Sequence, residues 1–238
     1  MLFRSLVKTE PDRPGPAARF GNAVHRLAEL HLTGTALSDA DVLRVCHDEN
    51  VRESQHDSVL RTWRTFHDWF AGSSHGQAPA DLHAEVALCF DPQTGAARVL
   101  GTGIGREYEK HGKRPNEIAG TADLVIVMSD RVLVYDWKTG SSPLARYRWQ
   151  LRGLGCMAAR AYARPEASWF AVKVGEGACE ELAEYMDRED LEGAELEMCR
   201  VWSESTAALP VLRPGPHCSD GYCRARKTCT AFTAWRER

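Results

Sequence analysis

Residues 120–140 read GTADLVIVMSDRVLVYDWKTG and contain two apolar, β-branched runs on either side of Ser129-Asp130. Such runs around a short polar turn predict an antiparallel β-hairpin. A turn centred on the Ser-Asp pair brings together residues that are equally far from it, so Asp123 is expected to face Asp136. The hairpin therefore predicts two carboxylates side by side on neighbouring strands.

Two opposed carboxylates at the ends of apolar strands are unfavourable unless positive charge lies beside them. A divalent cation that prefers oxygen ligands, Mg²⁺ or Mn²⁺, removes this repulsion. Lys138 shares a sheet face with Asp136, because side chains alternate along a strand, and its ammonium is a second source of positive charge. Two interpretations follow, a metal site at Asp123 and Asp136, or a charged rim of the hairpin that Lys138 neutralises.

The segments around the hairpin predict further elements. Apolar residues recur at spacings of three and four between residues 17 and 70, which predicts helices. Residues 83–90 alternate in the manner of a strand. Ser142 as N-cap and Pro143 as first helical residue predict a helix after the hairpin, followed by a strand up to residue 174. A last helix is expected over residues 180–204.

This order of elements predicts an α/β fold, a mixed central β-sheet flanked by helices, with a helical region at the N-terminal side. The expected divisions are a lead-in over residues 1–16, one domain over residues 17–205 with a helical front at 17–80 and a catalytic core at 81–175, and a Cys/Arg-rich tail over residues 206–238.

The composition of the 238-residue chain excludes several classes of protein. Hydrophobic residues make up 43% and charged residues 26%, as in globular proteins, and the net charge of −3 excludes a surface that is basic throughout. No apolar run is long enough for a membrane span or a signal peptide. We therefore expect a cytoplasmic protein with no membrane contact, whose eight cysteines are thiols or metal ligands rather than disulfides.

Several motifs together resemble a known family. Residues 120–123 (GTAD) and 136–140 (DWKTG) are similar to the signature of the PD-(D/E)XK nuclease superfamily, in the form found in RecB-like and CRISPR-associated RecB-like exonucleases. Residues 21–25 (GNAVH) resemble the G-x-x-x-H element of that group. Glu85 stands where its members often carry a further acidic residue, and Gln150 matches the first residue of their Q-x-x-x-Y motif.

The resemblance implies a restriction-endonuclease-like core and a divalent-metal-dependent nuclease, a hydrolase acting as an exonuclease on nucleic acid, DNA rather than RNA, in repair or recombination. The implied catalytic residues are Lys138, Asp136, Asp123 and Glu85. The implied ligands of Mg²⁺ or Mn²⁺ are His25, Asp123, Asp136 and the main-chain carbonyl of Trp137. The residues expected to bind the nucleic acid are Gln150 and Arg146. Because the sequence carries no ATPase motif, a protein partner such as a helicase or recombination factor is also expected.

Two features depart from this group. Leu154 replaces the tyrosine of the Q-x-x-x-Y motif. The tail carries Cys218, Cys223 and Cys229, which resemble the cysteines that hold a four-iron cluster in related nucleases, but three thiolates do not complete such a site. An iron–sulfur cluster or zinc is therefore an alternative that we do not favour. The departures leave a second function open, a catalytically inactive nucleic-acid-binding or assembly module that retains the nuclease fold.

Overall fold

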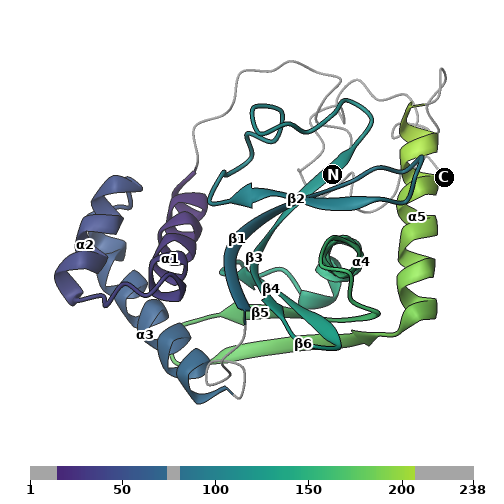
Figure 1. Ribbon diagram of the computed structural model, residues 1–238. Coiled ribbons are helices and arrows are strands. Elements are labelled where there is room, and N and C mark those ends of the chain that lie inside the picture. The colour runs from purple at the N-terminus through teal and green to yellow at the C-terminus, as the bar shows by residue number, and fades with distance from the viewer. Residues whose placement is uncertain (1–14, 74–80, 207–238) are drawn as a thin grey trace, which may run out of the picture. The chain divides into compact units, whose positions relative to one another are not determined.

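The computed structural model describes residues 15–73 and 81–206 (Figure 1). The chain divides into two compact units, residues 14–198 and a second unit formed by residues 1–13 and 199–238. Of the second unit the structure describes only residues 199–206, the last turns of helix α5 (Arg188–Thr206).

A mixed six-stranded sheet forms the centre of the larger unit, in the order β2-β1-β3-β4-β5-β6. Strands β4 and β5 are parallel, and all other neighbouring strands are antiparallel. The strands are β1 (Asp81–Phe90), β2 (Ala97–Thr102), β3 (Ile118–Val127), β4 (Arg131–Lys138), β5 (Glu166–Val174) and β6 (Cys179–Met186). The parallel pair needs a crossover, which helix α4 (Arg148–Ala161) provides. The expected α/β fold with a mixed, helix-flanked sheet is confirmed.

The β3–β4 hairpin has the register that the sequence predicts. Leu124 pairs with Tyr135, the pairing continues to the end of β3, and a hydrogen bond across the two-residue turn closes the hairpin. Asp123 and Asp136 are the next residues beyond the first pair. The same register therefore places them opposite each other at the open end of the hairpin.

Helices α1 (Pro16–Leu32), α2 (Asp39–Asp48) and α3 (His56–Gly72), with a short 3₁₀ helix η2 (Glu53–Gln55), lie on the sheet face opposite α4 (Figure 1). The apolar stripes of these helices pack on Leu124, Tyr135 and Trp137. A capping box begins α2, since the Ser38 hydroxyl accepts a hydrogen bond from the main-chain N–H of Asp41 and the Asp41 carboxylate accepts one from that of Ser38. Packing against α2 and α3 holds α1 against the sheet.

Helix α4 begins later than the sequence predicts. Pro143 is not the first helical residue but has an extended ψ of 138° and precedes a 3₁₀ helix, η3 (Leu144–Tyr147). A proline ring fixes φ and leaves ψ free, so proline at this position does not by itself start a helix. Leu154 of α4 is buried and packs against β3, where a Cβ on Gly120 would lie 3.0 Å from its Cδ2.

The helix predicted over residues 180–204 is wrong in its first part. Residues 179–186 form the edge strand β6, antiparallel to β5, after a turn in which Gly177 has a φ of +87°. Glutamate, leucine and alanine favour a helix locally, but pairing with the neighbouring strand overrides this preference. Helix α5 begins only after Asp187, whose carboxylate accepts a hydrogen bond from the main-chain N–H of Asp190 at 3.0 Å.

Candidate active site

Three side chains from different elements meet at one point of the larger unit. They are His25 of α1, Glu85 of β1 and Asp123 of β3, and one ligand atom from each lies within 4.8 Å of the others. The His25 Nδ1 atom is 3.2 Å from Asp123 Oδ1. Imidazole nitrogen and carboxylate oxygens at this spacing suit Mn²⁺ or Mg²⁺. The donor set therefore fits the divalent cation that the sequence predicts.

Asp136 lies beside this group of ligand atoms. Its carboxylate forms an ion pair with the Lys138 ammonium, and only 4% of the residue is exposed. The main-chain N–H of Trp137 donates to Asp123 Oδ2 with an N···O distance of 2.5 Å, so β4 also holds Asp123 through its backbone. The end of the hairpin thus combines two buried carboxylates and an ammonium group.

The electrostatics of the site show an excess of negative charge. Burial raises the pKa of Glu85, and the Asp123 carboxylate adds to this effect. Burial also raises the pKa of Asp136, with Asp123 adding to the effect and Lys138 opposing it. Burial alone would lower the pKa of His25, but Asp123 and the other carboxylates raise it to about 9. A divalent cation would supply the positive charge that these groups otherwise take up as protons.

Glu85 has a positive φ of +50°, which is unusual for a residue with a side chain. Its neighbours Ala84 and Val86 pair with β3 in one register, so Glu85 lies across from Asp123. The main-chain N–H of Gly103 donates to the carbonyl of Glu85 at 3.0 Å and supports this conformation. Such a backbone costs roughly 1–3 kcal/mol and is found where the surrounding structure imposes it. The strained backbone conformation therefore belongs to Glu85, one of the carboxylate residues of the candidate site.

Gly21 explains how α1 approaches the sheet closely enough for His25 to reach Asp123. A Cβ atom on Gly21 would lie 3.0 Å from Thr139 Oγ1, immediately after the end of β4. Gly21 and His25 are four residues apart and so share one face of the helix. The glycine of the G-x-x-x-H element thus permits the close contact, and the histidine one turn later lies beside Asp123.

The other candidate residues belong to β4 and to the elements that follow it. The Trp137 side chain packs on Phe66, with ring centroids 5.0 Å apart, so this residue can reach the site only through its main chain. Gln150 is half-buried in the first turn of α4, and Arg146 lies in η3 with an exposed side chain. Their roles, like those of the ligand residues, stay predictions.

Sequence reasoning missed Tyr147. The periodicity places this residue on the apolar face of a helix, but in the structure its ring lies in η3, 4.5 Å from the Lys138 Nζ atom. An ammonium over an aromatic face is stabilised by the ring quadrupole. The only signal for this contact in the sequence is an aromatic residue nine positions after the lysine. No spacing rule predicts that residues this far apart touch, so the contact could not be predicted.

The cysteines of the tail, Cys218, Cys223 and Cys229, lie outside the described residues. Cys46 is fully buried among the apolar side chains of the helices, and this burial raises the pKa of its thiol. A thiol in this environment is a poor metal ligand.

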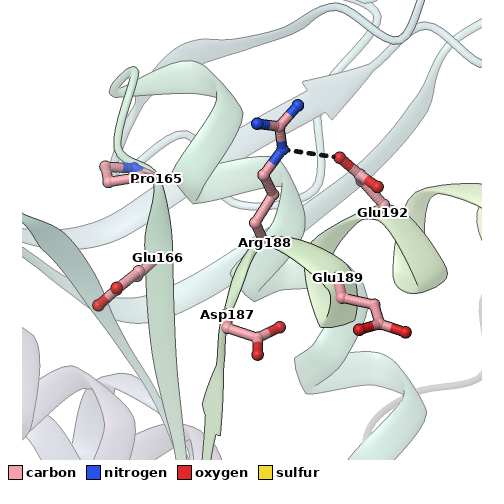
Figure 2. Close-up of a pocket in the computed structure, with 6 residues that line it drawn as sticks. All are labelled: Pro165, Glu166, Asp187, Arg188, Glu189 and Glu192. Atoms are coloured by element: carbon pink, nitrogen blue, oxygen red, sulfur yellow. Dashed lines mark hydrogen bonds and ion pairs between the residues drawn. The ribbon is translucent and has the colours of Figure 1, made fainter.

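A hollow of about 670 Å³ lies elsewhere, at the start of β5 and of α5 (Figure 2). Its lining includes Glu166, Asp187, Glu189 and Glu192, with Arg188 bonded to Glu192 at 2.9 Å. Because β4 and β5 are parallel and the candidate site is at the end of β4, the two places lie at opposite ends of these strands, roughly 20 Å apart. An acidic lining repels phosphate groups, so this hollow is a poor candidate for the nucleic-acid site.

Comparison with known proteins agrees with the motifs. A family model described as the PD-(D/E)XK nuclease superfamily matches residues 2–230. No curated protein matches the sequence significantly. Among solved structures, the one titled "Crystal structure of SSO0001" is 12% identical, with 89% of this chain and 96% of that chain covered and a TM-score of 0.39. No helix among the described residues has the length and apolar character needed to cross a membrane.

Proposed function

The chain belongs to the PD-(D/E)XK nuclease superfamily, and on this premise we propose that it is a divalent-metal-dependent nuclease that hydrolyses phosphodiester bonds. Members of this superfamily are generally metal-dependent nucleases. The observation that supports the proposal most directly is the group of His25, Glu85 and Asp123 beside the Asp136–Lys138 ion pair.

In this proposal His25, Asp123, Asp136 and the main-chain carbonyl of Trp137 hold Mg²⁺ or Mn²⁺. Glu85 is a further candidate ligand, because its carboxylate lies within 4.8 Å of the ligand atoms of His25 and Asp123. When bound, the ion polarises a phosphoryl oxygen and lowers the pKa of a water molecule. The Trp137 N–H binds Oδ2 of Asp123, and the other oxygen therefore faces His25. The backbone of β4 thus orients one carboxylate before any ligand arrives.

Lys138 acts on the attacking water and on the charge that develops on the phosphate. Its ammonium is held by the Asp136 carboxylate and the face of Tyr147. Both contacts restrict a side chain that is otherwise flexible, so the positive charge is in place before the transition state forms. This preorganisation is the reason for assigning the chemical step to Lys138.

We further propose that the substrate is DNA and that the enzyme acts as an exonuclease, because the G-x-x-x-H element and Gln150 resemble RecB-like nucleases. A helicase or recombination factor would then supply unwinding, and repair or recombination would be the process served. The cytoplasmic location and the absence of a complete four-iron cluster in the tail stay predictions.

The alternative, an inactive nucleic-acid-binding or assembly module, depended partly on the replacement of the motif tyrosine by Leu154. Leu154 is buried and packs against Gly120. Its identity therefore concerns the packing of α4 on β3. This observation favours the active enzyme over the module.

The decisive experiment incubates the purified protein with end-labelled single-stranded DNA, duplex DNA and RNA, in Mg²⁺, Mn²⁺ or EDTA. We expect cleavage of DNA in either metal, none in EDTA, and recovery when Mn²⁺ is added in excess. Closed circular DNA, which has no ends, separates exonuclease from endonuclease action. Binding of DNA without cleavage in either metal would establish the inactive module instead.

A further inference from the structure

Arg106 is an exposed arginine in the connection between β2 and β3. Within the part of the chain that the structure describes, its guanidinium forms no ion pair and no hydrogen bond. The carboxylates next to it in sequence already have cationic partners, because Glu107 pairs with Lys110 at 2.6 Å and Glu109 pairs with Lys113 at 3.4 Å. The positive charge of Arg106 is therefore not neutralised by its own loop and is available to an anionic ligand.

The start of this connection, residues 103–117, is held beside the candidate site. The main-chain N–H of Gly103 donates to the carbonyl of Glu85 at 3.0 Å. A Cβ on Gly103 would lie 3.5 Å from Oε1 of Glu29, which follows His25 by one turn of α1. The loop that carries Arg106 thus leaves the sheet next to the carboxylate and histidine residues of the site.

A second contact holds the loop on the other side of Arg106. The hydroxyl groups of Tyr108 and Thr121 share a hydrogen bond of 2.9 Å, and the Thr121 hydroxyl also donates to the carbonyl of Gly105 at 3.4 Å. Thr121 is two residues before Asp123 on β3. The main chain at Arg106 is therefore fixed from both sides, to β1 through Gly103 and to β3 through Tyr108.

The order of the strands separates this loop from Lys138. Glu85, Asp123 and Lys138 lie on β1, β3 and β4, which are consecutive in the sheet. Neighbouring strands are about 4.8 Å apart, so β1 and β4 are separated by roughly 10 Å. Arg106 and Lys138 thus lie on opposite sides of Asp123, and a strand of nucleic acid that presents one phosphate to Lys138 can reach the loop with another.

The charge of the site gives this arginine a purpose. The carboxylates of the site repel phosphate groups, and a bound cation offsets the repulsion at the phosphate that it contacts. A second phosphate needs positive charge from another source. A guanidinium binds phosphate oxygens through parallel hydrogen bonds. Connections longer than about 12–15 residues without a helix or strand are uncommon, and they are usually functional when ordered.

We propose that Arg106 binds a second phosphate of the nucleic-acid backbone, on the β1 side of the candidate metal site and across it from Lys138. The inference rests on the proposed function and deepens it by naming a backbone contact of the substrate. Phosphates carry no sequence information, so the contact positions the strand without selecting its sequence.

The test measures how the affinity for DNA depends on salt, because each phosphate contact contributes to that dependence. All proteins carry Lys138→Ala, so that the probe stays intact, and the variants add Arg106→Ala, Arg106→Lys or Arg52→Ala. Arg52, the residue before η2, is the matched control, because it is also exposed and has no ion pair among the described residues. Fluorescence anisotropy of a labelled DNA single strand gives Kd between about 50 and 300 mM KCl at constant Mg²⁺. Thermal unfolding verifies that each variant is folded.

We expect Arg106→Ala to weaken binding about three- to tenfold at the lowest salt concentration and to reduce the slope of log Kd against log salt concentration by about 0.7, the value for one phosphate contact of a single strand. Arg106→Lys should keep most of the slope, since an ammonium also neutralises a phosphate. Arg52→Ala should change neither the affinity nor the slope.

An unchanged slope in Arg106→Ala, with or without a loss of affinity, overturns the phosphate contact. An equal reduction in Arg52→Ala overturns it as well, because the effect would then belong to net charge, and so does the absence of DNA binding by the Lys138→Ala protein. Cleavage by the unsubstituted chain is measured separately. Binding with the expected slopes but without cleavage would contradict the nuclease proposal and leave the contact of Arg106 standing.

Discussion

Lys138 is the residue on which the proposed chemistry depends most. Lys138→Ala is expected to lower the rate of cleavage by about 100-fold or more, because it removes a preorganised positive charge from the transition state. Affinity for DNA should change little. Single-turnover cleavage and a separate binding measurement verify both parts.

Lys173→Ala is the control for that substitution. Lys173 is the register partner of Lys138 on β5, and its ammonium pairs with Glu180 at 3.5 Å. Its loss should leave the cleavage rate within about threefold. If Lys138→Ala cleaves at the rate of the unsubstituted protein, Lys138 has no part in the mechanism.

His25 is expected to act as a metal ligand. His25→Ala should raise the Mn²⁺ concentration for half-maximal rate by about tenfold or more, because it removes one of the donor atoms that surround the ion. Manganese titration of the rate measures this change. His67→Ala, an exposed histidine of α3, should not alter the Mn²⁺ requirement. An unchanged requirement for His25→Ala would leave the histidine as an ordinary residue of α1.

At the scale of the element, the distance between α1 and the end of β4 decides whether His25 reaches the site. Gly21→Ala places a methyl group about 3 Å from Thr139 Oγ1 and should push the helix outward. The expected result is an about tenfold lower activity and a higher Mn²⁺ requirement, since small displacements of catalytic groups are costly. Stability should be largely kept, because alanine favours a helix.

A second substitution tests whether Gly21→Ala lowers activity by displacing α1 or in another way. Gly21→Ala combined with Thr139→Ala removes the atom that the new methyl group contacts and should restore much of the activity. Gly193→Ala is the matched control, because a Cβ at this glycine of α5 meets nothing within 4 Å. Failure of the double substitution to recover any activity would show that the close approach at Gly21 does not set the position of His25.

At the scale of the whole molecule, Glu117 links the stability of the fold to pH. Its carboxylate is 3% exposed and accepts hydrogen bonds from Arg98 at 2.9 Å and from the main-chain N–H of Arg114 at 2.7 Å. Burial alone would raise the pKa of Glu117, but these bonds lower it below the ordinary value. A lowered pKa in the folded state gives stability that is present above the ordinary pKa and is lost as the pH falls through the folded value.

Glu117→Gln should therefore lower the free energy of unfolding by about 1–3 kcal/mol at pH 7, and the difference should shrink as the pH falls below about 4. Urea unfolding of both proteins at pH 7 and at acid pH measures this. Glu107→Gln, which affects an exposed pair with Lys110, is the control and should not change the stability measurably. A difference independent of pH would mean that the charge of Glu117 contributes nothing.

Local rules predicted the elements whose stabilising contacts lie close in sequence. The register of the β3–β4 hairpin depends on a two-residue turn and on alternation within the adjoining strands, and it is confirmed. Strand β6 was missed because its preference for a strand comes from its partner β5 and not from its own residues. The first part of its sequence favours a helix, and only pairing overrides that preference.

The sequence by itself determined the open end of the hairpin, since alternation and a two-residue turn are sufficient to bring Asp123, Asp136 and Lys138 together. Only the tertiary structure decided what surrounds them. His25 reaches Asp123 because Gly21 lets α1, which is far from the hairpin in sequence, pack against the end of β4. Spacing in the sequence determines contacts between neighbouring strands, whereas contacts between distant elements depend on how whole faces pack.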